Sequence, residues 1–195
     1  MSVTIRHGLP DPLRGDAARL YWQAFGAKLG RVLGPEPLAY ALLGRVMRGD
    51  HAIVALSDDG ALLGLVGFKS PSGAFAGGGF GDLRSIYGTF GAAWRAALLW
   101  LLERDLDNDR FLMDGICVAD TARSQGVGTA LLEAICAEGR ARGYPSVRLD
   151  VIDVNPRARA LYERQGFVAT HTSQIGMLRW VFGFSAATTL VRPLV

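Results

Sequence analysis

The chain has few cysteines and histidines, which argues against a disulfide-rich protein and against a metal site. Among its 195 residues there are only two cysteines, Cys117 and Cys136. Two cysteines cannot build a disulfide framework, and a reducing cytoplasm fits them best. The three histidines, His7, His51 and His171, do not have the spacing of metal ligands, so we predict no metal site.

Long apolar runs and clusters of basic residues are missing as well. The longest apolar run, residues 96–102, is too short to cross a membrane, and residues 1–6 lack the design of a signal peptide. The net charge is only +3, and the sequence has no basic face with interleaved aromatic residues. We therefore expect a cytoplasmic protein that binds neither membranes nor nucleic acid, although a mildly positive balance suits a polyanionic cofactor.

The composition that remains is that of a globular chain, and its length suits a single domain over residues 1–195. Apolar periodicity and alternation predict helices at 12–26, 37–47 and 83–106, and strands at 3–6, 51–56, 61–68, 168–172 and 186–191. We expect the glycine-rich residues 70–82 to form a mobile loop, either a lid or a plain connector. The helix at 83–106, which includes Phe90 and Trp94 in its apolar period, is expected to pack on the sheet.

The first informative motif joins a strand, a glycine loop and a helix. A short apolar strand runs from Asp114 to Val118, the loop Arg123-Ser124-Gln125-Gly126-Val127-Gly128 follows, and helix is predicted from Thr129. Such a loop presents backbone N–H groups to an anion, and the helix N-terminus adds partial positive charge. By itself the loop fits an ordinary surface turn equally well. A dinucleotide fingerprint would need a third glycine where this chain has Leu131, and a P-loop would need a lysine.

The second motif follows about one helix and one strand later. Residues 147–152 read as a strand, and Asn155 then precedes a short helix that Gly166 ends. Asn155 is a good N-cap, and Pro156 fits the first helical position. The spacing places Asn155, Ala158 and Tyr162 on one face of that helix.

Together the two motifs resemble the GNAT family of acetyl-CoA-dependent N-acetyltransferases. The resemblance rests on Arg-x-x-Gly-x-Gly at 123–128 and Asn-x-x-Ala-x-Ala-Leu-Tyr-x-x-x-Gly-Phe at 155–167. It implies an α/β (α+β) fold: a mixed, mostly antiparallel sheet with one splayed parallel strand pair and helices on both faces. It also implies acceptor-side elements over about 1–110 and an acetyl-CoA-binding core over about 111–170.

The resemblance further implies how acetyl-CoA is held. Backbone N–H groups from Gln125 to Thr129 would bind its phosphates, and the free edge of the first strand would pair with its pantetheine arm. We expect the N–H of Val118 to stabilise the oxyanion and Asn155 to bond the cofactor arm, although Asn155 also fits a pure N-cap. The implied cofactor-binding set is Ile116, Cys117, Val118, Arg123, Ser124, Gln125, Gly126, Val127, Gly128, Thr129, Asn155 and Tyr162.

Two residues are candidates for proton transfer. Tyr162 resembles the general acid of the family, which protonates the leaving thiolate; the alternative is a tyrosine that only packs at the sulfur. Asp114 is the leading candidate for the base, because it shares strand parity with Ile116 and Val118; the alternatives are a structural aspartate and a water relay. Asp150, Asp153 and Glu36 are weaker rivals. The side chain of Cys117 is expected to face the core, where it is no nucleophile.

The acceptor side carries no specific signature. Tyr21, Trp22, Phe25, Glu36 and Tyr40 are candidate acceptor contacts, with core packing as the alternative for Tyr21 and Phe25. Residues 176–184 are too apolar for an exposed loop, so we expect them to cover the site or to meet a second subunit in a homodimer.

The predicted function is transfer of an acetyl group from acetyl-CoA to a primary amine by direct attack in a ternary complex. The acceptor would be a small molecule or a protein or peptide amine, with a narrow acidic pocket favouring a polyamine and an open groove favouring a peptide. The alternatives are a non-catalytic acyl-CoA-binding regulatory domain and a dinucleotide oxidoreductase.

Overall fold

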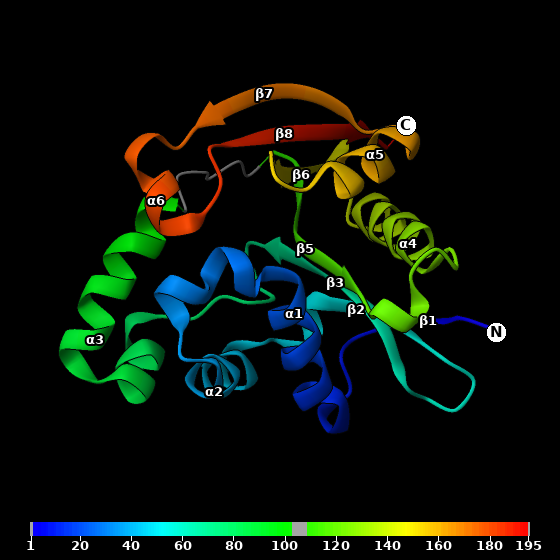
Figure 1. Ribbon diagram of the computed structural model, residues 1–195. Coiled ribbons are helices and arrows are strands. Elements are labelled where there is room, and N and C mark those ends of the chain that lie inside the picture. The colour runs from blue at the N-terminus through cyan, green and yellow to red at the C-terminus, as the bar shows by residue number, and fades with distance from the viewer. Residues whose placement is uncertain (1, 103–108, 195) are drawn as a thin grey trace.

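The computed structural model describes residues 2–102 and 109–194, which form a mixed sheet with helices on both faces (Figure 1). The sheet has eight strands in the order β1-β2-β3-β5-β6-β8-β7, with β4 beside β3. Every neighbouring pair is antiparallel except β5 and β6. The strands are β1 (Thr4–His7), β2 (Ala52–Leu56), β3 (Leu62–Ser70), β4 (Gly73–Ala74), β5 (Phe111–Val118), β6 (Ser146–Ile152), β7 (Val168–Gln174) and β8 (Ala186–Pro193).

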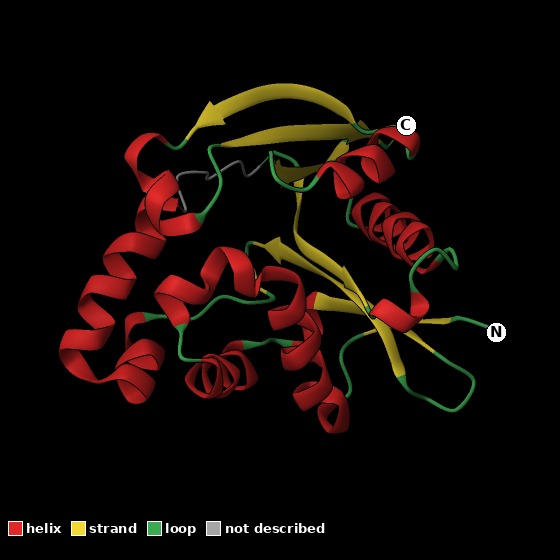
Figure 2. Cartoon of the chain, viewed as in Figure 1, coloured by secondary structure: helices red, strands yellow, loops and turns green. Residues whose placement is uncertain are grey.

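The helices divide between the two faces of the sheet and one flank (Figure 2). α4 and α5 pack on one face, α1 and α2 lie over the other, and α3 and α6 continue the α1–α2 layer at one side. Their bounds are α1 (Arg14–Leu33), α2 (Glu36–Val46), α3 (Phe80–Leu102), α4 (Val127–Ala141), α5 (Pro156–Arg164) and α6 (Arg179–Phe182). The predicted fold class is confirmed.

Each face of the sheet has its own core, because alternate strand residues point to opposite sides. On the α4 side, Phe111 and Leu149 pack with Leu131 of the helix. On the α1 side, Leu65 packs with Tyr21. A third cluster joins α1, α2, α3 and α6 away from the middle of the sheet.

Two predicted helices differ from the observed ones. α1 continues past Gly26 to Leu33, because Val32 and Leu33 are buried in the third cluster, and their burial outweighs a glycine cost of about 1 kcal/mol. α3 is kinked at Gly88, where φ is +70°, and it packs mainly on α1 and α2 rather than on the sheet. The kink breaks the helical period, so Phe90 is left exposed. The predicted end of this helix at 106 lies outside the described residues.

The glycine-rich segment 70–82 is better anchored than its composition predicts. It contains β4, and the side chain of Phe75 is fully buried against the α1-side core. The Phe75 N–H donates to the carbonyl of Phe68, and its carbonyl accepts from the N–H of Arg48. The residues around Phe75 thus form a short strand and a buried anchor in place of the irregular loop that was predicted, while the mobility of the segment and its role as a lid stay predictions.

Within residues 2–102 and 109–194, no helix combines the length and the apolar character that a membrane span requires.

Removal of the Phe75 ring should destabilise the protein strongly. We expect Phe75→Ala to lower the free energy of unfolding by about 3–5 kcal/mol, the usual cost of emptying a well-packed aromatic site. Phe90→Ala is the matched control: its ring is 90% exposed, so the change should stay within about 0.5 kcal/mol. Urea denaturation of both variants measures this, and equal midpoints would show that the segment is not packed on the sheet.

Candidate active site

The central feature of the site is the early separation of β5 from β6. The two strands pair only at their starts, where Phe111 faces Val147 and Leu112 faces Arg148. Beyond Leu112, β5 stays paired with β3 as far as Val118, and β6 stays paired with β8 as far as Ile152. The sheet therefore opens at its middle, as the splayed pair predicted from the sequence requires (Figure 1).

A β-bulge lies where the opening begins. Gly67 of β3 faces Gly115 of β5, but the next residue, Phe68, faces Met113, so Asp114 is the extra residue. A bulge bends its strand and increases the local twist, which turns β5 away from β6. The predicted shared parity of Asp114 with Ile116 and Val118 is wrong, because the extra residue shifts the alternation.

The two sets of side chains consequently face different cores. Ile116 and Val118 pack against the α4-side core. The carboxylate of Asp114 instead accepts a hydrogen bond from the N–H of Ala76 at 3.2 Å, on the α1 side, where Ala76 packs against that core.

The edge of β5 that faces the opening carries unpaired backbone groups. The N–H of Ala119 donates to the carbonyl of Leu63 on β3 at 2.8 Å. Antiparallel pairing alternates along a strand, so Cys117 also directs its backbone groups to β3. The N–H groups of Ile116 and Val118 therefore point into the gap that β6 has left.

The N-terminus of α4 adds further donors beside this edge. α4 begins at Val127, two residues earlier than predicted, with Gly126 as N-cap at φ +82°, a conformation that glycine adopts without strain. The first helical bond runs from the N–H of Ala130 to the carbonyl of Gly126. The N–H groups of Val127, Gly128 and Thr129 thus have no acceptor within the helix.

The loop before α4 is held by its own side chains. Arg123 pairs with Asp120 at 2.6 Å, and the amide of Gln125 donates to the carbonyl of Thr121 at 2.7 Å. Ser124 has φ +62°, an uncommon value for a residue with a side chain. These contacts hold the loop in place without a ligand. Its backbone N–H groups lie at the start of α4, and the guanidinium of Arg123 is paired with Asp120.

The second motif lies directly against the first. A Cβ added to Gly128 would lie 3.2 Å from a methyl group of Leu161 on α5, so a side chain here would crowd the facing helix. Asn155 caps α5, since its side-chain oxygen accepts from the N–H of Ala158 at 3.2 Å. The capping role of Asn155 is thus observed, while its contact with a cofactor stays a prediction.

Tyr162 projects from α5 into the core below the opening. Its side chain is 6% exposed and packs edge-on against Phe167. Burial, with a smaller contribution from Cys117, raises the pKa of the Tyr162 phenol above its ordinary value, so the phenol stays protonated. Among the described residues its hydroxyl has no hydrogen-bond partner. Burial also raises the pKa of the Cys117 thiol to about 12, which leaves it protonated and unreactive.

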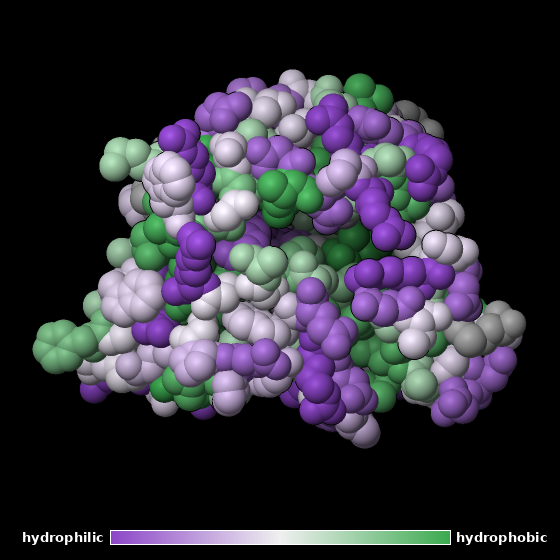
Figure 3. Space-filling view, viewed as in Figure 1, coloured by the Kyte–Doolittle hydropathy of each residue, from purple (hydrophilic) through white to green (hydrophobic). Residues whose placement is uncertain are grey.

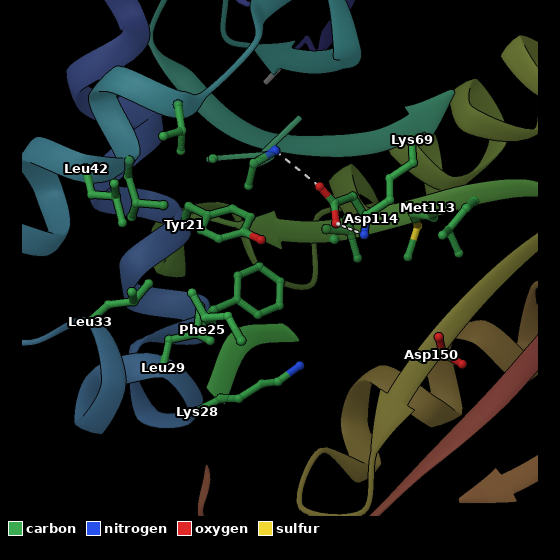
Figure 4. A pocket seen from close by; sticks show the side chains of 18 of the residues that line it. Tyr21, Phe25, Lys28, Leu29, Leu33, Leu42, Lys69, Met113, Asp114 and Asp150 are labelled. Atoms are coloured by element: carbon green, nitrogen blue, oxygen red, sulfur yellow. Dashed lines mark hydrogen bonds and ion pairs between the residues drawn. The ribbon is translucent and has the colours of Figure 1, made fainter. Parts of the chain in front are cut away.

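Tyr162 contributes to the lining of a cavity of about 360 Å³, to which residues of α1 and α2 also contribute (Figure 4). In the space-filling view the surface is hollowed between α5 and α1, with apolar side chains in the recess (Figure 3). Asp114, Asp150, Lys28 and Lys69 are the charged residues of its lining. Lys69 approaches Asp114 to 4.0 Å.

The structure sorts the other acceptor candidates. Tyr21 and Phe25 line the cavity and also pack on each other, with ring centroids 4.4 Å apart. Tyr40 donates to Glu36 at the surface, and neither belongs to the cavity lining. Asp153 accepts from the N–H groups of residues 185 and 186, which indicates a structural role.

Residues 176–184 cover the outer side of α1. Phe182 and Phe184 are buried, and the carbonyl of Trp180 accepts a hydrogen bond from Arg31 of α1. The side chains of Met177 and Trp180 remain exposed.

The two lysines of the lining were missed as site residues. One feature of the sequence could have pointed to them. They are the only two lysines of the chain, and all its other Lys or Arg residues are arginines.

Comparisons with known proteins agree with this geometry. The sequence model of the acetyltransferase (GNAT) family matches residues 16–167. An N-acetyltransferase from Staphylococcus aureus Mu50 is 15% identical, with a TM-score of 0.67 over 96% of this chain and 99% of the other. A Corynebacterium glutamicum structure described as histone acetyltransferase HPA2 and related acetyltransferase is 20% identical, with a TM-score of 0.67 over 99% and 97%.

A further similar structure carries the cofactor of the family. It comes from Bacillus anthracis str. Ames, is assigned as a streptothricin acetyltransferase and was solved in complex with acetyl coenzyme A. It is 15% identical, with a TM-score of 0.50 over 73% of this chain and 61% of the other. The family model matches residues 16–167, and the structure has a splayed strand pair and a cavity in the same region. The chain therefore belongs to the GNAT acetyltransferase family, whose members use acetyl-CoA.

Proposed function

We propose that the protein transfers the acetyl group of acetyl-CoA to a primary amine by direct attack in a ternary complex. The observation that supports this most is the opening between β5 and β6. Backbone N–H donors of β5 and α4 lie on one side of it, and the cavity of about 360 Å³ lies on the other. Both substrates can thus reach one point from opposite directions. The division into acceptor-side elements over about 1–110 and a cofactor-binding core over about 111–170 stays part of this proposal.

The residues present fit acetyl-CoA as co-substrate. The N–H groups of Val127, Gly128 and Thr129, at a helix start of partial positive charge, would hold its phosphates. The edge of β5 at Ile116 and Val118 would pair with its amide-bearing arm as an added strand does. Acetyl-CoA supplies an acetyl group that is activated as a thioester.

The chain's own groups then serve the proton transfers. Asp114, through a water molecule, accepts a proton from the attacking amine, whose nitrogen forms the new bond to the carbonyl carbon. The N–H of Val118 donates to the carbonyl oxygen while it is negatively charged. Tyr162 gives its proton to the sulfur as the carbon–sulfur bond breaks and recovers one from solvent.

The alternative is an acyl-CoA-binding regulatory domain without catalysis. The buried phenol of Tyr162 and the carboxylate of Asp114 both line the cavity, and a domain that only senses acyl-CoA needs neither. We therefore favour the enzyme. The homodimer also stays a proposal, for which exposed Met177 and Trp180 are the candidate surface.

The phosphate site can be tested at Thr129 without damage to the helix. Glu is favoured in the first turn of a helix, so Thr129→Glu should keep the protein stable while its charge repels the phosphates. We expect the Kd for acetyl-CoA to rise at least about tenfold, or 1.4 kcal/mol, relative to Thr129→Gln. Isothermal titration calorimetry measures this, and equal affinities of the Glu and Gln variants would contradict the assigned phosphate site.

The acid role can be tested with Tyr162→Phe, which keeps the ring. We expect kcat to fall by about 10²-fold, the lower part of the range for general acids, because a thiolate leaves fairly easily. The KM for acetyl-CoA should change less than about twofold. Because the pKa of Tyr162 is raised, the phenol keeps its proton up to and beyond pH 10, so wild-type kcat should show no loss from Tyr162 ionisation between pH 6 and 9. An unchanged kcat in the variant would show that Tyr162 only packs.

The base role can be tested with Asp114→Asn by comparing two pH values. An alkylamine has a pKa near about 10.4, so a base is needed most at neutral pH. We expect kcat/KM to fall at least about tenfold at pH 7 and to recover most of that loss at pH 9.5, where more of the amine is already neutral. A loss of the same size at both pH values would assign Asp114 a structural role instead.

A further inference from the structure

The cavity of the proposed acetyltransferase is the part of the molecule that distinguishes its acceptor. Its charged lining is neither uniformly acidic, as a polyamine would require, nor neutral and open, as a peptide groove would be. Two carboxylates, Asp114 and Asp150, share it with two ammonium groups, Lys28 and Lys69. Both lysines of the 195-residue chain are therefore placed in this one cavity.

Lys28 is the group that most needs a partner from outside the protein. It extends from α1 toward the open part of the cavity, on the side where Asp150 lies (Figure 4). Among the described residues its amine has no carboxylate within ion-pair distance, and it lies over the ring of Phe184, 5.4 Å from the ring centroid. Burial lowers the pKa of Lys28, Asp150 and Asp114 oppose that shift, and Lys69 adds to it. An anion on the ligand would relieve this cost.

The two carboxylates are already oriented by the protein. Asp114 is held by the N–H of Ala76 and by Lys69, and Asp150 accepts from the hydroxyl of Thr189. Both are therefore fixed acceptors in the lining that Tyr162 shares, and they could receive an ammonium group.

Apart from these charged residues and the phenols of Tyr21 and Tyr162, the side chains of the lining are mostly apolar. Leucine and valine side chains from α1, α2 and α3 close the end away from the sheet: Leu29, Leu33, Leu42, Val46, Leu83 and Leu99. Such a surface accepts a hydrocarbon or aromatic group and gives no partner to a second charged or polar one.

We propose that the acceptor is a free α-amino acid with an apolar or aromatic side chain. Its carboxylate pairs with Lys28, its amine is received by Asp114, and its side chain fills the apolar end. This inference rests on the proposed acetyl transfer and specifies its substrate. A polyamine would meet two lysines, and a peptide N-terminus lacks the adjacent free carboxylate.

The test compares three amines that differ only beside the nitrogen: phenylalanine, phenylalaninamide and phenethylamine. With saturating acetyl-CoA, CoA release gives kcat/KM for each. We expect the wild type to prefer phenylalanine to phenethylamine by at least about tenfold, the equivalent of one charge-assisted contact. Lys28→Met should reduce this preference to within about twofold by raising KM for phenylalanine, while the Kd for acetyl-CoA stays unchanged.

Matched variants separate the charge in the cavity from charge in general. Lys28→Arg should retain part of the preference. Arg19→Met, which removes a positive charge from the exposed face of the same helix, should leave it intact. The variants are compared by the ratio of kcat/KM for phenylalanine to kcat/KM for phenethylamine. The two amines differ in basicity by the same amount in every variant, so this difference cancels.

Several results would overturn the inference while the acetyl-transfer function stands. These are equal turnover of phenethylamine and phenylalanine by the wild type, a preference that Lys28→Met leaves unchanged, and faster turnover of spermidine than of any amino acid. A gain of one acetyl group on Lys28 itself, seen by mass spectrometry in place of turnover, would overturn it too. Binding of acetyl-CoA with no CoA release from any amine would instead contradict the proposed function, and the inference with it.

Discussion

The structure depends on one local break in backbone pairing. β5 and β6 share two paired positions and then part, so a sheet that is otherwise continuous presents bare N–H groups in its middle. Unpaired backbone groups inside a protein are costly and are normally satisfied. Here the bulge at Asp114 keeps them apart, and α4, α5 and α1 surround the opening. In the proposed function these donors bind the amide groups of the cofactor arm.

The two sides of the opening have opposite chemical character, which in the proposed reaction would keep the two substrates apart. The α4 side offers backbone donors and a helix N-terminus, which suit a polyanion; Arg123, whose contact with the cofactor stays a prediction, is paired with Asp120. The α1 side offers fixed carboxylates and an ammonium group over an apolar floor, which suits a small amphipathic amine. Tyr162 lies where the two meet, in a protonated state that burial maintains.

The cofactor side could be predicted from the sequence because its requirements are local. Gly126 takes a left-handed conformation before a helix and Asn155 caps the next helix, and each of these features is visible in a few consecutive residues. The face of Asp114 could not be predicted, because a bulge is a property of the pairing with β3 and not of β5 alone. Lys28 was missed because α1 was expected to end at Gly26, and only packing with distant helices carries it further.

The central claim is that the free edge of β5 binds acetyl-CoA through alternate residues. Amide hydrogen exchange followed by NMR, with and without acetyl-CoA, tests it most directly. The account predicts that binding slows exchange at Ile116 and Val118 and at residues 127–129, while Cys117, already bonded to β3, changes little. Equal protection along the whole of β5, or none at Ile116 and Val118, would contradict it.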